Sequence, residues 1–375
     1  MFKNRLSYAA VVLVLFIFVF LRDAPMTYTA FYAVLILPII SYVVGYFSKR
    51  NITAAEELSH EFVTKNEKTY YKVRIHNAGF LPCFFARIYF EFEEIGLVSN
   101  TSHTYFSIEP KSYFEVKVQL SGKYRGVYKI APSSVVVYDF LGIFKYKLHF
   151  QSGITLIIAP LITQVPELAS EITQQGETIV KRHIQGQDHT SSAELREYQI
   201  TDSYKQIHWK ATAKRNELIS KNPQEIEQLA TVFFINNLRI PKAVDSMLAR
   251  EDKLMDLAVS VMSHCNQSGH RMLMQAVNIQ QREFTTNFTR LYHEVAALPF
   301  GEFGSIHPIM NDYLHSGNMM ENVFLFTQSL DDELILALQE FKLLGSHVTL
   351  FLFGSATRSH LRKLVSLDIK CVQDE

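Results

Sequence analysis

The sequence predicts a membrane-anchored protein with three folded parts: a transmembrane helical hairpin, an antiparallel β-sandwich of the Ig-like kind, and a doubly wound α/β domain. Two uncharged apolar runs open the chain, a region of period-two alternation follows, and strand patterns then alternate with helix patterns. We expect the hairpin at residues 1–50, the sandwich at 51–160, a connector at 161–228 and the α/β domain at 229–375.

The two apolar runs extend from Leu6 to Leu21 and from Met26 to Phe47, and neither contains a charged residue. The second is roughly 33 Å long as a helix, which is enough for a hydrocarbon core of about 30 Å. The short link between the runs predicts a hairpin. A cleaved signal peptide is the alternative interpretation of the first run, but no small-residue cleavage site follows it and a second span comes at once.

Basic residues flank the hairpin at both ends, whereas its link pairs one basic residue with one acidic residue. They are Lys3 and Arg5 before it, Lys49 and Arg50 after it, and Arg22 beside Asp23 in the link. The positive-inside rule then places both ends of the hairpin, and the whole body that follows, in the cytoplasm. The reverse topology, which would make the chain an extracellular binding protein, stays open as an alternative.

The region after the hairpin has the period-two pattern of half-buried strands. Tyr71, Val73 and Ile75 alternate with polar residues, and similar runs occur at 114–120 and 144–150. Turn residues such as glycine, proline and asparagine separate these runs. Short strands at this spacing predict an antiparallel sandwich.

The last third of the chain alternates strand and helix patterns. Strands are expected at 230–238, 270–277, 322–327, 347–353 and 368–372, and helices at 244–265, 331–344 and 355–365. Such alternation predicts a parallel, doubly wound sheet, whose crevice lies at the carboxyl ends of its strands.

Composition and motifs exclude several classes of function. Lys+Arg and Asp+Glu both number 37, so the chain lacks the basic surplus of a nucleic-acid binder. It contains no GxxxxGK[ST], GxGxxG, GxSxG or HExxH pattern. Cys83, Cys265 and Cys371 lack the spacing of a metal site and are expected to be reduced thiols. We therefore expect no cofactor, and we identify no small-molecule substrate.

Residues 194–227, here called the charged segment, hold the chain's one tryptophan, Trp209, among basic residues flanked by acidic ones. Asp202 is placed to cap a helix beginning near Ser203. Lys214 and Arg215 lie beside an indole, and such a group of side chains is suited to bind an acidic partner. Alternatively, Trp209 anchors the connector against the sheet while the mixed charges pair internally.

A third hypothesis makes the charged segment a catalytic site. It requires His208 to act as a base beside Asp202 or Glu194, next to a pocket. This reading belongs to a different functional class from partner binding, and the sequence alone leaves it open.

Several residues of the charged segment follow one pattern in order: Glu194, Arg196, Tyr198, Asp202, Ile207, Trp209, Ala213, Lys214, Arg215, Leu218 and Glu225. This pattern resembles the signature of a bacterial family called domain of unknown function 58. The stretches Gly122–Tyr128 and Asp139–Phe144 resemble two further elements of that family. Thr201 and Phe140 replace the family's usual glycine and proline. The resemblance covers nearly the whole chain.

The resemblance implies a von Willebrand factor A-like domain at the C-terminal end and a bacterial inner-membrane location. It also implies a partnership with MoxR-type AAA+ ATPases, in assembly rather than catalysis, with the signature residues binding the partner or bracing the fold. Related domains often hold a divalent cation at the end of the first strand through Asp-x-Ser-x-Ser. Here Asn236 and Asn237 take that place, and hard cations prefer carboxylates. We therefore expect a degenerate site without metal.

Overall fold

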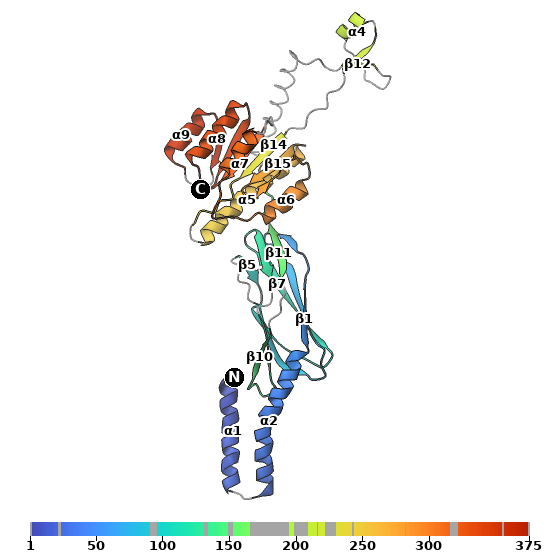
Figure 1. Ribbon diagram of the computed structural model, residues 1–375, viewed down its shortest axis with the longest axis vertical. Coiled ribbons are helices and arrows are strands. Elements are labelled where there is room, and N and C mark those ends of the chain that lie inside the picture. The colour runs from blue at the N-terminus through green and yellow to red at the C-terminus, as the bar shows by residue number, and fades with distance from the viewer. Residues whose placement is uncertain are drawn as a thin grey trace. The chain divides into compact units, whose positions relative to one another are not determined.

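The computed structural model describes residues 2–21, 24–90, 96–130, 134–148, 153–165, 195–198, 209–215, 217–221, 230–241, 244–281, 283–315, 322–354 and 356–373. The chain divides into two compact units, Met1–Pro160 and Leu161–Glu375. Figure 1 shows the helices and strands of both units.

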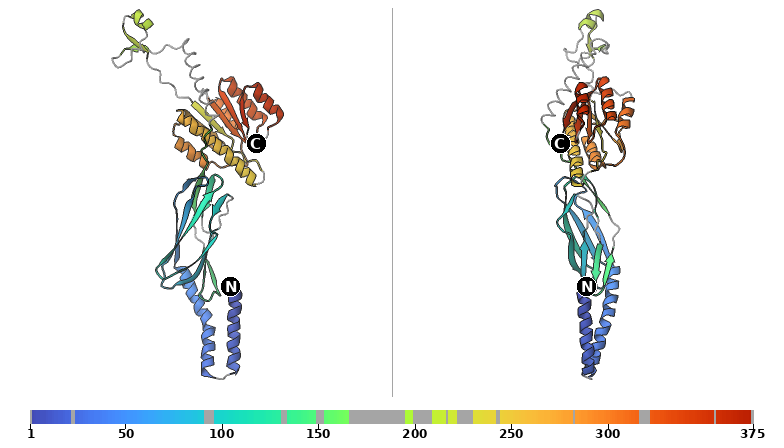
Figure 2. Two further views of the ribbon diagram at one scale, coloured as in Figure 1. Left: turned by 180° about the vertical axis from the view of Figure 1, so that it is seen from behind. Right: turned by 90° about the vertical axis from the view of Figure 1, so that its left-hand side faces the viewer.

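Two apolar helices open the first unit: α1 (Phe2–Leu21) and α2 (Pro25–Arg50). Pro25 lies at the first turn of α2, where its fixed φ and missing N–H are tolerated. Both helices are long and apolar enough to cross a membrane. They run side by side as an antiparallel hairpin (Figures 1 and 2). Apolar side chains are exposed around both helices, as lipid-facing helices require.

The β-domain follows, with strands at 52–159. They are β1 (Ile52–Leu58), β2 (Phe62–Thr64), β3 (Thr69–Asn77), β4 (Cys83–Tyr89), β5 (Leu97–Ser99), β6 (His103–Ile108), β7 (Tyr113–Gly122), β8 (Gly126–Ile130), β9 (Ser134–Tyr138), β10 (Lys145–Leu148) and β11 (Ile154–Ala159). They form sheets of order β1-β3-β7-β5, β10-β9-β4-β6 and β2-β11-β8. All pairs are antiparallel except β2 with β11, which is parallel.

One hydrophobic core joins the three sheets of the β-domain. Tyr71 and Val73 come from β3, Ile88 from β4, Val135 from β9 and Leu156 from β11, and all are fully buried. The period-two pattern in β3 therefore separates a core face from a solvent face, as expected. The antiparallel character of the region is confirmed, whereas its Ig-like connectivity stays a prediction.

The second unit contains a six-stranded sheet of order β16-β15-β14-β17-β18-β19. The strands are β14 (Ala230–Ile235), β15 (Arg271–Ala276), β16 (Ile279–Gln280), β17 (Asn322–Thr327), β18 (His347–Leu352) and β19 (Lys370–Gln373). All neighbouring pairs are parallel except β15 with β16. We call this part, with its helices, the α/β-domain.

Helices cover both faces of that sheet. They are α5 (Val244–Gln267), α6 (Phe288–Ala297), α7 (His307–His315), α8 (Asp332–Leu343) and α9 (Arg358–Ser366). α5 and α6 share one core with Phe233 and Phe324, whereas α7, α8 and α9 share the opposite core with Phe234 and Leu325. Alternate residues of β14 and β17 thus face opposite cores, which explains why these strands are apolar throughout. Figure 2 shows the helices on either side of the sheet.

The structure adds elements that no sequence pattern predicted. β16, α6 and α7 all lie between β15 and β17. α6 begins after Asn287, whose side chain accepts a hydrogen bond from the backbone of Arg290. These elements are short, so their periodicity is too brief to stand out from the surrounding loops.

The charged segment contributes a small antiparallel pair and a short helix, here called the connector unit. β12 (Leu195–Glu197) pairs with β13 (Ile219–Lys221), and α4 covers Trp209–Arg215. Thr212 of α4 accepts a hydrogen bond from the backbone N–H of Ile219 at 3.1 Å, which ties the helix to β13. The predicted helix start near Ser203 lies outside the described residues.

Candidate functional site

The chain order of the sheet reverses between β14 and β17, and in doubly wound sheets such a switch point is where ligands bind. Asn236 follows β14 and Thr327 ends β17. Their side chains meet there, because the Asn236 amide donates to the Thr327 hydroxyl at 3.0 Å. The Thr327 hydroxyl in turn donates to the carbonyl of Ser329 at 2.7 Å. The switch point is therefore lined by neutral, mutually bonded groups.

Two buried polar atoms at this switch point have no hydrogen-bond partner among the described residues: Oδ1 of Asn236 and Nε2 of Gln328. Both residues are less than a tenth exposed. The loop around them is tightly packed, since a Cβ added at Gly354 would lie 2.2 Å from the Gln328 carbonyl oxygen. The Asn236 side-chain oxygen can therefore accept a hydrogen bond at this edge of the sheet, and the Gln328 amide can donate one. Neither group carries a charge.

Asn237 acts as a brace instead of pointing to a ligand. Its amide donates to the carbonyl of Pro299 at 2.7 Å, and its Oδ1 accepts from the backbone N–H of Val277 at 3.1 Å. One side chain thereby links the ends of β14 and β15 to the loop after α6. These bonds occupy both the amide and the carbonyl of Asn237.

A buried carboxylate of α5 is held by an arginine that follows this edge. Arg239 forms two hydrogen bonds to the buried Glu251 of α5, at 2.8 and 3.0 Å. The bonds to Glu251 raise the pKa of Arg239 above its ordinary value. Among the described residues no group of three or more His, Cys, Asp or Glu side chains is placed to hold a metal ion. The expectation of a degenerate, metal-free site at Asn236 and Asn237 stays a prediction.

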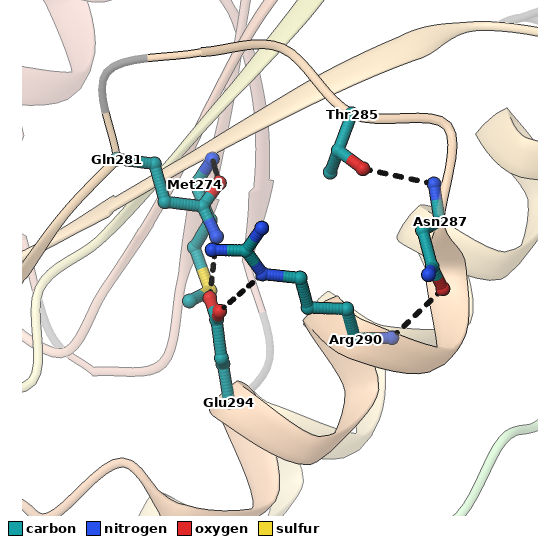
Figure 3. Close-up of polar contacts among 6 residues, drawn as sticks. All are labelled: Met274, Gln281, Thr285, Asn287, Arg290 and Glu294. Carbon is teal, nitrogen blue, oxygen red and sulfur yellow. Dashed lines mark hydrogen bonds and ion pairs between the residues drawn. The ribbon is translucent and has the colours of Figure 1, made fainter.

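A separate cleft of about 340 Å³ lies between the β15–β16 hairpin and α6. Arg290 pairs with Glu294 one turn further along α6 at 3.0 Å, and Gln281 donates to the same carboxylate (Figure 3). The side-chain oxygen of Gln281 also accepts a hydrogen bond from the backbone N–H of Met274 at 3.0 Å. These polar groups satisfy one another, so the cleft is a braced surface feature and carries no reacting pair that we can assign.

The structure places the predicted signature residues unevenly. Glu194, Asp202, Ile207 and Glu225 lie outside the described residues, as does His208 of the catalytic hypothesis.

Arg196 lies in β12 and Arg215 ends α4, with only their backbone described. Tyr198 donates its backbone N–H to the carbonyl of Leu218 at 2.8 Å, which extends the β12–β13 pairing. The catalytic hypothesis therefore stays untested.

Of the signature residues on α4, the structure describes the side chains of Trp209, Ala213 and Lys214. The indole of Trp209 is 65 % exposed, and Lys214 is exposed as well. Leu218 beside them is 48 % exposed, while Ile219 is buried. The connector unit thus presents a large aromatic, an apolar and a cationic side chain to its surroundings.

A further polar group escaped the sequence analysis. Asp139 in the β9–β10 turn is buried and accepts a hydrogen bond from Ser41 of α2. Its other oxygen accepts from the backbone N–H of Phe144 at 2.7 Å. The only sequence signal was that Asp139–Phe144 forms one of the family-like elements, which says nothing of a contact with a helix near the N-terminus.

Comparison with known proteins adds little. No family model and no curated protein matches the sequence significantly. Among solved structures, the cupredoxin domain of amoB from Nitrosocaldus yellowstonii is 9 % identical over 31 % of this chain and 96 % of its own, at a TM-score of 0.21. An exo-β-N-acetylglucosaminidase from Vibrio harveyi is 6 % identical over 86 % and 81 %, at a TM-score of 0.19. Likeness at such TM-scores supports no conclusion on fold or activity.

Proposed function

We propose that this chain is a membrane-anchored, non-catalytic interaction protein that docks a cytosolic AAA+ ATPase of the MoxR type during assembly of protein complexes. The hairpin would hold the body at the inner face of a bacterial membrane, in line with the basic residues at its ends. The α/β-domain would be a von Willebrand factor A-like module without metal, an assignment with which the doubly wound sheet is compatible. The connector unit would be the docking element.

The exposed indole of Trp209 is the observation that carries this proposal. Tryptophan is on average highly buried, and exposed aromatic anchors with a neighbouring cation are typical of binding hot spots. α4 presents that indole together with the exposed Lys214, on a unit that backbone pairing and the Thr212 bond hold in shape. A docking element needs this combination of a rigid support and an unburied anchor.

The test is co-purification of the full-length protein from its own membrane after crosslinking. Trp209→Ala is expected to reduce recovery of the ATPase at least ten-fold, as loss of a hot-spot side chain does. Because the indole is largely exposed, the thermal unfolding profile of this variant should match that of the parent. Leu343→Ala is the matched control, since Leu343 is 78 % exposed on α8, outside the connector unit.

Arg215→Ala supplies the second arm of the experiment. If both Trp209→Ala and Arg215→Ala retain the ATPase at the parent level, the docking role of the connector unit is wrong. If no AAA+ ATPase is recovered with the parent protein either, the partnership itself is wrong.

A further inference from the structure

Three loops of the β-domain gather at its hairpin end: residues 78–82, 109–112 and 139–144, here called the hairpin-end loops. β3, β6 and β9 end there, and β4, β7 and β10 begin there, as the strand registers require. The backbone N–H of Lys111 donates to the carbonyl of Gly79 at 3.2 Å, which joins the first two loops.

Both helices of the hairpin bond to these loops. Arg5 of α1 donates to the carbonyl of Ile143 at 3.0 Å, and Ser48 of α2 donates to the carbonyl of Pro82 at 3.2 Å. Ser41, Gly45 and Ser48 form the buried side of α2 against the β-domain. The hairpin and the loops therefore keep a fixed relation to one another.

The length of α1 sets the position of these loops relative to the membrane surface. Beyond Arg5, the apolar stretch Leu6–Leu21 spans roughly 24 Å as a helix. This length is slightly less than the thickness of a hydrocarbon core, about 27–30 Å. The apolar stretch therefore does not extend beyond the core, and the loops bonded next to it lie close to the bilayer. A hairpin that spans the membrane thus holds the loop at Asp139–Phe144 in the headgroup layer.

Aromatic side chains are exposed at this level. Phe80 is 80 % exposed, Phe85 is 60 % and Phe84 is 44 %, and the ring of Phe84 lies 6.1 Å from that of Phe140. Exposed apolar groups gathered at one end of a domain mark an interaction surface. Phenylalanine is among the side chains that bury at the boundary between headgroups and acyl chains where a protein surface lies on a membrane.

Basic residues accompany these rings. The Lys111 ammonium lies 4.6 Å from the centre of the Phe80 ring, and Lys145 at the start of β10 is exposed. Arg50, at the end of α2, is exposed too. Of the described carboxylates in these loops, Asp139 is buried and hydrogen-bonded, which leaves Glu109 as the exposed one. The surface is therefore cationic as well as aromatic.

We propose that the hairpin-end loops, together with the first residues of β4 and β10 that adjoin them, bind the anionic phospholipid headgroups of the membrane that the hairpin spans. Phe80, Phe84 and Phe85 lie among the headgroups, while Lys111 and Lys145 contact lipid phosphates. A basic, aromatic surface beside a membrane span suits this partner, since anionic leaflets attract juxtamembrane lysines. The inference rests on the membrane placement in the proposed function, but not on the ATPase partnership.

The full-length protein offers a direct test because Trp209 is its one tryptophan. In a Trp209→Phe background, single tryptophans are introduced as Phe85→Trp, Phe18→Trp and Val98→Trp. The variants are reconstituted in phosphatidylglycerol–phosphatidylcholine vesicles containing brominated acyl chains. Phe18 is an exposed residue of α1, and Val98 is exposed on β5, which pairs with the far end of β7. All three sites are at least half exposed, which favours correct folding of the variants.

Strong quenching is expected for Phe18→Trp, clear quenching for Phe85→Trp and none for Val98→Trp. Quenching at Phe18→Trp without quenching at Phe85→Trp would overturn the surface proposal while leaving the membrane anchor intact. Absence of quenching at both sites would overturn the membrane placement and the surface with it. Equal quenching at Val98→Trp would show non-specific adsorption and would also overturn the proposal.

A charge test separates anionic headgroups from lipid in general. Spin-labelled phosphatidylglycerol should associate with the reconstituted parent several-fold more than spin-labelled phosphatidylcholine at low salt. Lys111→Gln with Lys145→Gln should remove most of that preference. Lys363→Gln, on α9 of the α/β-domain, is the matched control and should leave it unchanged. An unchanged preference in the double variant would overturn the role of the two lysines.

Discussion

Ser41 of α2 donates its hydroxyl hydrogen to the carboxylate of Asp139, which lies 98 residues further along the chain. Both residues are almost fully buried. A buried carboxylate is tolerated only where donors surround it, and here the helix supplies one and the backbone of Phe144 the other. One side chain thus joins the apolar hairpin to the β9–β10 turn.

We expect Asp139→Ala to loosen this junction. It leaves the Ser41 hydroxyl and the Phe144 N–H without their acceptor, at a cost of about 1–3 kcal/mol. The measurement is amide hydrogen exchange of β9 and β10 in the detergent-solubilised protein, which should become faster. Asp139→Asn is the control, because its side chain still accepts from Phe144 and can donate to Ser41. Equal exchange rates in Asp139→Ala and the parent would contradict this account.

Gly45 allows α2 to approach the β-domain closely. A Cβ at this position would lie 2.6 Å from Cε2 of Tyr146, a buried ring whose hydroxyl donates to the carbonyl of Tyr42 at 2.8 Å. Gly45→Ala should therefore displace the ring and destabilise the first unit by about 1–3 kcal/mol. Thermal unfolding in detergent measures the effect.

Gly153→Ala is the matched control for Gly45→Ala, because no atom lies within 4 Å of the Cβ it would add. The same melting temperature for both variants would show that close approach at Gly45 is unimportant.

Arg239→Ala should destabilise the α/β-domain strongly. It leaves Glu251 buried without its two hydrogen bonds, and breaking a buried pair in this way costs about 3–5 kcal/mol. We expect the lower part of this range, since the side chain of Arg239 is 31 % exposed. The measurement is unfolding by denaturant, with amide exchange in β14 and α5 as the readout. Adding Glu251→Leu to Arg239→Ala should recover much of the loss, and a strictly additive double variant would argue against the pair.

His270 should make the α/β-domain sensitive to acid. It is buried beside Thr231, with Nδ1 2.8 Å from the threonine hydroxyl, and burial lowers its pKa to about 4 from its ordinary value of 6.5. Between these two values the unfolded chain binds the additional proton. The free energy of unfolding should therefore fall as the pH drops below 6.5, by up to about 3 kcal/mol near pH 4.

The measurement for His270 is the midpoint of urea unfolding at pH 7 and at pH 4.5, in the parent and in His270→Gln. The glutamine variant should lose less stability on acidification, because it removes this titrating group. The same pH dependence in both proteins would exclude His270 as its source.

The elements that sequence patterns predicted best are continuous apolar strands and long amphipathic helices. β17 occupies the expected residues 322–327, and α5 covers the expected stretch to within two residues at its C-terminal end. β13 did not stand out, because three residues carry too little periodicity. α4 lies within the helix expected from near Ser203, although the start of that helix lies outside the described residues. The role of Asn237 was unpredictable for another reason: its partners, Pro299 and Val277, lie 62 and 40 residues away.

Local pattern alone determined that this chain has two apolar helices, a strand-rich region and an alternating strand–helix region, because periodicity and composition act over neighbouring residues. Tertiary structure alone decided that Asp139 meets Ser41, that Arg239 neutralises Glu251, and that Asn236 faces Thr327 where the sheet order reverses. The three contacts join residues that lie 98, 12 and 91 positions apart in the chain. They form only when strand register and helix packing bring both partners to one place. Local sequence patterns therefore do not predict these contacts.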